Sequence, residues 1–445
     1  MKNNKIYFRN SNFPGPKARK IIRWAERYYA TTTVASEIVP AKAVGAKVWD
    51  IDGNEFIDFV AGVGVSNTGF GNSEIIDPMI THLKETGILN FIHHDFYNPW
   101  ATKLAKRMAR RMELYFQKKG INREFKMFFT NSGAESIEAA LKLVWANRPE
   151  RQKIISFKGA FHGRTMGALS LLTKDVHIKD YPRNLRSLFI HLTFPKDPET
   201  FEVFKKEING LNLAEFGALF MEIIQGEGGL NPLYPPAAEF IQKELVEEAG
   251  IYLVVDEIQT GNARTGKYLA FEHYPMLNPT IILTAKGAAS GMPFGAVWFP
   301  KNMDWKERGR HSSTYGGNAL AAIAAGATLE YIRRHNLVKR VERMGHILRA
   351  ELLKLEEEFS CVRNIRGFGL MQGFDVIDSA GVPSPVLRDK IEAEAPRWGL
   401  ILMRCGQAGI RILPPLTTTE EEVKEGLERL RQVIKYALSE KNEKR

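Results

Sequence analysis

The chain has 445 residues, of which 44% are hydrophobic and 25% are charged. These proportions exclude a disordered or fibrous chain and allow one large domain with a smaller companion. The formal net charge of +11 is spread along the chain between acidic residues, which favours solvated helix faces over nucleic-acid binding.

Neither membrane insertion nor secretion is expected. The sequence has no apolar run of the roughly 18 residues that a membrane-spanning helix needs, and its first ten residues carry charges without an apolar core. The two cysteines, Cys361 and Cys405, are too few for a disulfide framework or a zinc site. We therefore expect a cytoplasmic protein without a metal, in which both cysteines serve as packing residues.

The N-terminal segment, residues 1–70, predicts a helix and a hairpin. An amphipathic stretch follows Pro16, and residues 47–59 resemble two strands joined by a turn at Asp52-Gly53-Asn54. We expect this segment to pack with the C-terminal domain.

Residues 71–335 predict a large α/β domain. From about residue 125 to 290, short apolar runs alternate with amphipathic stretches, which is typical of a mostly parallel sheet flanked by crossover helices. The expected strands are residues 125–129, 153–157, 218–222, 251–256 and 280–284. The expected helices include residues 133–147 and 236–248, the second followed by Gly250, which suits a left-handed cap.

Residues 336–445 predict a smaller α+β domain. An alanine-rich helix over residues 319–334 precedes the boundary near residue 335. Short strands are expected around residues 367–376 and 410–413, and a charged helix from Thr419 onward.

Polar loops follow the expected strands, at the edge where open α/β sheets bind ligands. After the first strand, Ser132 and Gly133 open a helix, which suits a phosphate held by backbone N–H groups and the helix dipole. The same residues also fit a simple N-cap. The next loop combines the aromatic ring of Phe161 with Arg164, whose guanidinium suits a carboxylate.

Two charged residues follow apolar runs. A carboxylate at Asp256 is costly there without a cationic or hydrogen-bonding partner. Lys286 follows another such run, and partial burial favours the neutral amine that forms an imine. A structural carboxylate and a lysine that reaches solvent are the alternatives for each residue taken singly.

Taken together, seven segments in this order resemble the class III (ω-type) aminotransferases of the fold-type I pyridoxal-phosphate enzymes over nearly the whole chain. The segments are Asn131-Ser132-Gly133-Ala134-Glu135, Phe161-His162-Gly163-Arg164-Thr165, residues 222–229, residues 256–261, Lys286, residues 313–318 and the Arg411 segment 410–416. The resemblance implies a large domain with a mostly parallel central sheet and a smaller α+β domain.

The resemblance implies pyridoxal 5′-phosphate as the cofactor, carried by Lys286 as a Schiff base. Asp256 would hold the pyridine nitrogen, and Glu222 joins these two as an expected catalytic residue. Further cofactor contacts are expected from Ser132, Gly133, Ala134, Phe161, His162, Gln259 and Thr314. In such enzymes the threonine that Thr314 matches reaches the phosphate of the neighbouring subunit. The resemblance therefore implies a homodimer with shared active sites.

The resemblance also implies how two substrates share one site. Arg411 would bind the α-carboxylate of glutamate, Glu227 would neutralise Arg411 when the donor has no α-carboxylate, and Arg164 would take the distal carboxylate. Val63 matches the aliphatic residue of 4-aminobutyrate enzymes. We therefore expect a ping-pong transfer of the ω-amino group of 4-aminobutyrate, or a similar donor, to 2-oxoglutarate. An ornithine or lysine ω-aminotransferase is the alternative.

Two other functions compete with this prediction. Residues 289–293 resemble the corresponding loop of related amino-acid racemases or epimerases, whereas Arg164 and the Tyr315-Gly316-Gly317-Asn318 segment match transaminases. Residues 261–267 imitate a nucleotide-binding P-loop, but Tyr268 occupies the position of its metal-binding hydroxyl. Within the same stretch, Asn262-Ala263 departs from the glycine or aromatic pair common in the family.

Overall fold

The computed structural model describes residues 9–31, 36–90, 95–179, 181–182 and 186–439. The chain divides into two compact units. The large unit is Ser73–Val338, and the small unit combines Met1–Asn72 with Lys339–Arg445. These bounds lie within a few residues of the expected positions 70 and 335.

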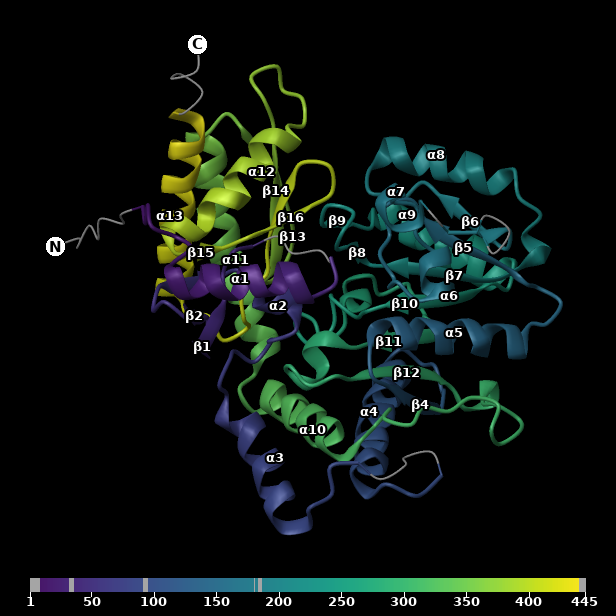
Figure 1. Cartoon of the computed structure of the whole chain (residues 1–445). Helices are drawn as coiled ribbons and strands as arrows, with labels where there is room; N and C mark the ends of the chain where they lie inside the picture. Colours follow the sequence, from purple (N-terminus) through teal and green to yellow (C-terminus); the bar gives the residue numbers. More distant parts are fainter. Residues whose placement is uncertain (1–8, 32–35, 91–94, 180, 183–185, 440–445) are drawn as a thin grey trace. The chain divides into compact units, whose positions relative to one another are not determined.

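Within the described residues, the large unit contains a seven-stranded sheet with the order β4-β12-β11-β10-β7-β5-β6 (Figure 1). The strands are β4 Phe125–Thr130, β5 Lys153–Phe157, β6 Phe189–Leu192, β7 Phe216–Glu222, β10 Tyr252–Asp256, β11 Ile281–Thr284 and β12 Gly295–Pro300. Strand β12 is antiparallel to both of its neighbours, and the other pairs are parallel. The predicted α/β fold with a mostly parallel central sheet is confirmed.

Helices pack around this sheet. They are α3 Ser73–Thr86, α4 Pro99–Lys118, α5 Gly133–Asn147, α6 Met166–Ser170, α7 Asp175–Ile178, α8 Pro198–Asn209, α9 Pro235–Phe240 and α10 Ala319–Arg334. The short strands β8 Ile224–Gln225 and β9 Asn231–Pro232 form a separate pair. Helix α5 has the predicted bounds, and its face with Ile137 and Leu141 is fully buried in the core cluster that includes Val254. The apolar stripe on α5 therefore specifies both the helix and its packing on the sheet.

The structure differs from the sequence prediction at several elements of the large unit, and β6 is one that was not among the expected strands. The expected helix over residues 236–248 is α9 followed by a π-helix at Ile241–Glu248, in which the Ala249 N–H donates to the Glu244 carbonyl five residues back. Strand β12 was not predicted at all. Its six residues are buried without alternation, a pattern that periodicity does not distinguish from a buried helix.

The small unit contains two four-stranded sheets among its described residues. One has the order β1-β2-β3-β15, from β1 Pro40–Val44, β2 Lys47–Asp50, β3 Glu55–Asp58 and β15 Leu400–Ile401; the other has the order β13-β14-β17-β16, from β13 Val362–Phe368, β14 Met371–Val376, β17 Gly409–Ile412 and β16 Met403–Cys405. Because β15 pairs with β3, the N-terminal hairpin and the C-terminal segment form one sheet. Cys361 and Cys405 are both buried here.

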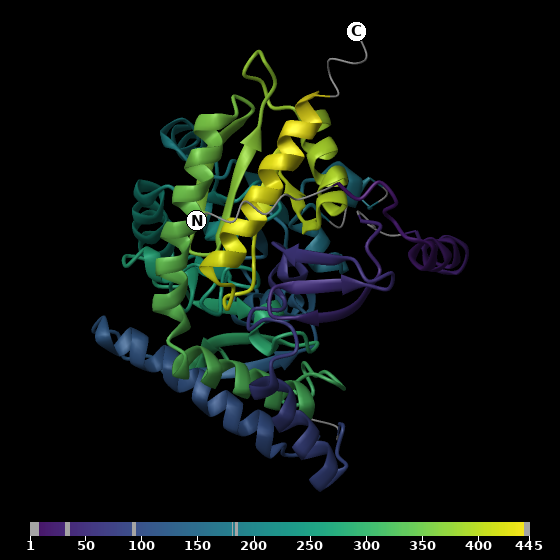
Figure 2. The same cartoon turned by 90° about the vertical axis from the view of Figure 1, so that its left-hand side faces the viewer.

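The helices of this part of the chain are α1 Pro16–Tyr28, α2 Ala61–Gly64, α11 Leu337–Glu358, α12 Pro385–Glu394 and α13 Glu420–Ser439. Figure 2 shows α1 extending away from the strands β1 to β3. The Asp52 carboxylate fixes the start of α1 by accepting from the N–H groups of Lys17 at 3.0 Å and Ala18 at 2.8 Å. Asp52 lies in the predicted hairpin turn between β2 and β3, so this turn caps helix α1.

Candidate functional site

The centre of the candidate site is the carboxyl end of β7 and β10. The sheet register places Asp256 directly beside Glu222. The Asp256 Oδ2 atom lies 2.8 Å from Nδ1 of His162, and Oδ1 accepts from the Ile258 N–H at 2.9 Å. Burial lowers the pKa of His162, but the hydrogen bond to Asp256 and the charges of Asp256 and Glu222 outweigh it and raise that pKa. His162 thus supplies Asp256 with a hydrogen-bonding partner of the kind that the sequence required.

Glu222 is a buried carboxyl that organises the loops around this centre. Its two oxygens accept from the N–H groups of Phe161 at 3.1 Å and Gly226 at 3.0 Å. Burial raises the pKa of Glu222 to about 7, with the His162 charge acting against the rise and Asp256 adding to it. Glu222 therefore joins the loop after β5 to the turn after β7.

The N-terminus of α5 forms the second part of the site. The Ser132 hydroxyl caps the helix by accepting from the Glu135 N–H at 3.2 Å. The N–H groups of Gly133 and Ala134 are therefore left for a ligand, as first-turn donors have no partner within a helix. A Cβ atom at Gly133 would come within 2.7 Å of Ile258 Cδ1, so a larger residue there would require Ile258 to shift. This end of the helix has the form of a phosphate cradle.

Two buried polar atoms near Asp256 have no hydrogen-bond partner among the described residues. They are Oε1 of Gln259 and Nε2 of His162. A Cβ atom on Gly226 would lie 2.2 Å from the same Gln259 oxygen, so a larger residue at 226 would displace the Gln259 side chain. An acceptor buried in this way needs a donor from a ligand. The ring hydroxyl of pyridoxal phosphate is such a donor, and the residues present fit the cofactor.

Lys286 follows β11 and opens the 3₁₀ helix Lys286–Ala289 in a left-handed conformation, with φ of 44°. The loop that departs from the family lies beside this strand. Asn262 and Ala263 both have positive φ, 58° and 71°, and the Asn262 amide donates to Thr284 Oγ1 at 2.9 Å. Asparagine tolerates this conformation better than most residues. The Asn262-Ala263 pair therefore supports the end of the strand that carries Lys286.

Phe161 lies at the centre of a group of charged and aromatic side chains. The Arg164 guanidinium is 5.8 Å from the centre of the Phe161 ring, and the His177 ring on α7 is 5.9 Å from it in an edge-on contact. Burial lowers the pKa of His177, the charges of Arg164 and Lys174 lower it further, and Glu227 raises it. Arg164 and Glu227 therefore both act on one position beside Phe161. His177 was not predicted, because a single histidine on a short helix has no sequence pattern.

The remaining expected site residues are Thr314, Val63 and Arg411. Thr314 is exposed on the large unit, and its carbonyl accepts from the Asn90 amide at 3.3 Å. Val63 and Arg411 belong to the small unit. Val63 has a φ of 64°, rare for a β-branched residue, in a turn whose N–H groups bond to Asp58. Arg411 is buried on β17, with Nη2 2.9 Å from Met403 Sδ.

The P-loop alternative does not fit the structure. Residues 261–266 form turns, and the next element is the 3₁₀ helix Ala270–His273 rather than an α-helix opened by Lys267. In the described part of the chain, no group of three His, Cys, Asp or Glu side chains is arranged to hold a metal ion. None of the described helices is both long and apolar enough to cross a membrane.

The sheet order and the strand-end residues Asp256 and Lys286 define the fold-type I pyridoxal-phosphate transferases. Comparisons with known proteins agree. The family model for aminotransferase class III matches residues 28–434. The chain belongs to the class III aminotransferases, whose cofactor is pyridoxal 5′-phosphate and which act on an amino donor and an oxo acid.

Individual relatives extend this comparison. An acetylornithine aminotransferase of Archaeoglobus fulgidus is 35% identical, over 91% of this chain and 98% of the relative. An alanine/serine racemase of Pyrococcus horikoshii is 32% identical, over 97% of this chain and 93% of the relative. The structure of an ornithine aminotransferase from Toxoplasma gondii, with pyridoxal phosphate at partial occupancy, superposes with a TM-score of 0.84 at 27% identity and covers 96% of both chains.

Proposed function

We propose that this aminotransferase moves the terminal amino group of an ω-amino acid to 2-oxoglutarate. The observation that carries the proposal is the group of side chains around Phe161. In this group Arg164 and Glu227 carry opposite charges, and both act on His177. An arginine there can hold the distal carboxylate of 2-oxoglutarate. A nearby carboxylate suits a site that also admits a donor lacking a second acidic group. The roles of Val63 and Arg411 rest on the resemblance.

The protein's residues divide the work of holding the cofactor. Pyridoxal phosphate, when bound, supplies an electron sink for the carbanion formed when the substrate loses a proton. Gly133 and Ala134 would hold its phosphate through their N–H groups, and Phe161 would stack on its ring. Asp256, anchored by His162 and the Ile258 N–H, would keep the ring nitrogen protonated.

Lys286 would carry the cofactor at rest and move the proton during transfer. Its amine would take the proton from the substrate carbon as a general base and would deliver it to the cofactor carbon as a general acid. Glu222 would act indirectly, since its two hydrogen bonds hold the Phe161 backbone and the Gly226 turn next to Gln259. Gln259 would accept from the ring hydroxyl.

The choice of donor favours ornithine-type substrates. Two of the three relatives named above are an acetylornithine aminotransferase and an ornithine aminotransferase. We therefore place ornithine and N-acetylornithine ahead of 4-aminobutyrate, which the aliphatic Val63 alone supports, and lysine after them. We further propose a cytoplasmic homodimer in which Thr314 reaches the cofactor phosphate of the second subunit.

A donor screen tests the proposal. The enzyme loaded with pyridoxal phosphate is incubated with 2-oxoglutarate and, in turn, ornithine, N-acetylornithine, 4-aminobutyrate and lysine, and glutamate is measured. We expect glutamate from at least one of these donors, with ornithine or N-acetylornithine giving the highest kcat/KM. The absence of glutamate with all four contradicts the proposal.

A racemase is the second candidate, because the Pyrococcus horikoshii relative matches 97% of this chain. The loop of residues 289–293 also resembles the racemase version. A racemase converts L-alanine or L-serine to its mirror image without an oxo acid. Chiral chromatography after incubation of the holoenzyme with each amino acid alone distinguishes the two activities, and we expect no D-amino acid.

A further inference from the structure

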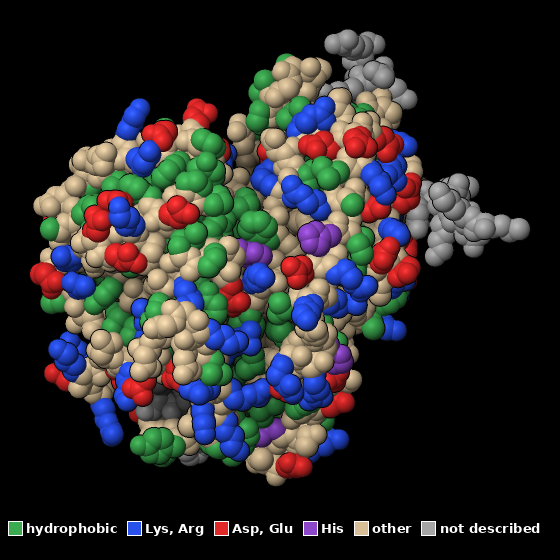
Figure 3. Space-filling view, turned by 180° about the vertical axis from the view of Figure 1, so that it is seen from behind, with side chains coloured by type: hydrophobic (Ala, Val, Ile, Leu, Met, Phe, Trp, Pro, Cys, Tyr) green, Lys and Arg blue, Asp and Glu red, His purple; other side chains and the backbone are tan. Residues whose placement is uncertain are grey.

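A cavity on the large unit lies outside the site described above. It has a volume of about 660 Å³ and is bordered by α4, α10 and the 3₁₀ helix Ala270–His273. Figure 3 shows Lys and Arg side chains gathered low on the back face, at the height where Figure 1 places α4 and α10. No lining residue belongs to the cofactor site, so the cavity needs an explanation of its own.

The lining of the cavity is strongly basic. Six of its side chains are cationic, against two carboxylates, Glu272 and Glu330. The cationic side chains are Lys106, Arg107, Arg110, Arg111, Lys118 and Arg333. On α4 these positions recur every three or four residues, so they form one stripe along the helix. A fold that needed only solubility would not concentrate one sign of charge in a hollow, because like charges repel.

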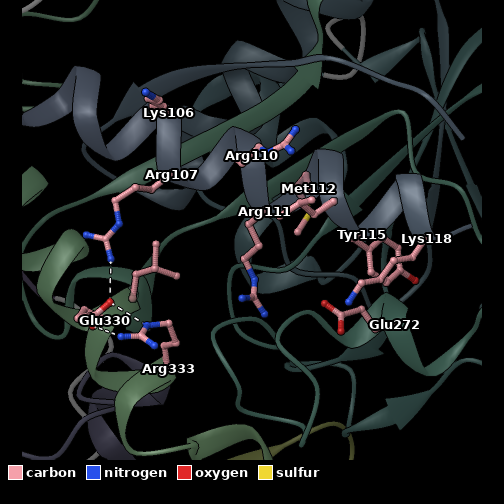
Figure 4. Close-up of a pocket in the computed structure, with 12 residues that line it drawn as sticks. Lys106, Arg107, Arg110, Arg111, Met112, Tyr115, Lys118, Glu272, Glu330 and Arg333 are labelled. Carbon is pink, nitrogen blue, oxygen red and sulfur yellow. Dashed lines mark hydrogen bonds and ion pairs between the residues drawn. The ribbon is translucent and has the colours of Figure 1, made fainter.

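The carboxylates do not balance this charge. Glu330 contacts three guanidinium groups at once, with Arg107 at 3.2 Å, Arg333 at 2.5 Å and Arg334 at 3.3 Å. Hydrogen bonds from Arg333 hold the pKa of Glu330 near 2, so it is fully ionised and shared. Figure 4 shows the ion pairs of Glu330 with Arg107 and Arg333 at one end of the cavity, and Glu272 with Tyr115 toward the other. The region between them offers cationic side chains to a ligand, although the charge of Arg111 also acts on Glu272, where it opposes the rise in pKa that burial causes.

Arg111 lies in that middle region (Figure 4). Its guanidinium stacks 3.5 Å from the centre of the Tyr268 ring, and its Nε atom is buried without a hydrogen-bond partner among the described residues. Stacking fixes the plane of the guanidinium and leaves the edge, where its N–H donors lie, free to bind an oxyanion. Burial raises the pKa of Tyr115 to about 12, so its hydroxyl also remains a donor at the cavity wall.

We propose that this cavity binds a small anion with at least two negative charges, a phosphoanhydride or a polycarboxylate, with Arg111 as its central contact. Arg107 and Arg333 bind the same anion from the Glu330 end, and Lys118 from the other end. An anion with only one negative charge would leave most of these cationic side chains without a counter-charge. The volume admits a molecule of the size of pyrophosphate or citrate.

Titration calorimetry on the cofactor-loaded enzyme in 0.15 M NaCl tests the proposal. Pyrophosphate is the probe in one arm and citrate in the other, and the visible absorption of the cofactor is followed in parallel. We expect saturable binding of at least one anion with no change in that absorption. Binding of only one identifies the class of anion.

Variants locate the binding. We expect Arg111→Gln to weaken binding at least tenfold, because a paired, charge-assisted contact is lost. Arg111→Lys keeps the positive charge but loses the planar guanidinium, so its affinity for the anion should lie between those of the unaltered enzyme and Arg111→Gln. Arg333→Gln, whose side chain is 69% exposed, cannot unfold the core and should weaken binding about threefold or more. Arg308→Gln, an exposed arginine outside the cavity, is the matched control and should leave binding unchanged.

Three results overturn the proposal. The first is the absence of saturable binding of both anions to the unaltered enzyme. The second is an affinity of both the Arg111→Gln and the Arg333→Gln variants that equals the affinity of the unaltered enzyme. The third is release of the cofactor on binding, which would place the anion at the α5 cradle. If a second copy of the chain covers the cavity instead, neither anion should bind. The Arg111→Gln variant should then also assemble into a species of lower mass than the unaltered enzyme.

Discussion

At the scale of single residues, the strand ends create groups whose protonation is set by burial. Asp256 keeps a partner through His162, and burial raises the pKa of the neighbouring Glu222 to about 7. Lys286 leaves its strand in a left-handed conformation that costs backbone energy. Such strain is typical of functional positions, where the surrounding structure enforces it.

The lysine gives the most specific prediction at this scale. Lys286→Ala should abolish the visible absorption band of the lysine-bound cofactor, since no other amine is expected to form that bond. Spectroscopy of the purified variant after incubation with pyridoxal phosphate measures this. Lys306→Ala, an exposed lysine on the same unit, should keep the band. A band that persists in Lys286→Ala would show that another lysine carries the cofactor.

The buried Glu257 predicts a dependence of stability on pH. It accepts from Thr260 Oγ1 and the Phe271 N–H, and burial raises its pKa from 4.5 to about 7. The folded state therefore favours its neutral form, so its contribution is complete below pH 4.5 and is lost as pH rises through 7. Between pH 5 and 8 the unaltered protein should lose on the order of 1–3 kcal/mol more unfolding free energy than Glu257→Gln.

Urea unfolding of both proteins without cofactor at the two pH values measures this difference. Glu150→Gln, at an exposed position, should follow the unaltered protein. Parallel pH profiles for the unaltered protein and Glu257→Gln would mean that Glu257 is ionised in the fold.

At the scale of elements, capping by distant residues positions the helices. Asp52 caps α1 across 34 residues of sequence, and Ser132 caps α5 locally. Asp52→Ala should destabilise α1 by about 1 kcal/mol, the usual cost of losing an N-cap. Hydrogen exchange of residues 17–28 should become about fivefold faster, whereas Glu26→Ala should not change it, because Glu26 is exposed and caps nothing. Unchanged exchange in Asp52→Ala would mean that α1 does not depend on the cap.

The elements also show how much the sequence could predict. Helices α5 and α10 have the predicted bounds because their apolar stripes are long and are closed by clear caps. Strand β12 was not foreseen, since its antiparallel pairing with β4 joins segments distant in sequence. The π-helix was not foreseen, because the apolar pattern of residues 236–248 does not distinguish it from an α-helix. Among site residues, Asp256 could be inferred from an isolated charge after an apolar run. His177 and the left-handed Val63 could not, because tertiary packing alone places them.

At the scale of the whole molecule, the chain joins a common aminotransferase framework to a basic cavity away from the cofactor site. The framework is shared by proteins that differ in activity, since both acetylornithine aminotransferase and alanine/serine racemase are relatives. Fold alone therefore does not choose the reaction. We propose that the charges of Arg164 and Glu227 around Phe161 determine the reaction, because they select which amino group approaches the cofactor.

The fate of one nitrogen atom tests that account most directly. Ornithine labelled with ¹⁵N only at its terminal amino group is incubated with the cofactor-loaded enzyme and 2-oxoglutarate, and the glutamate formed is analysed by mass spectrometry. We predict glutamate that carries the label. Unlabelled glutamate would show transfer of the α-amino group instead and would contradict the proposed ω-amino transfer.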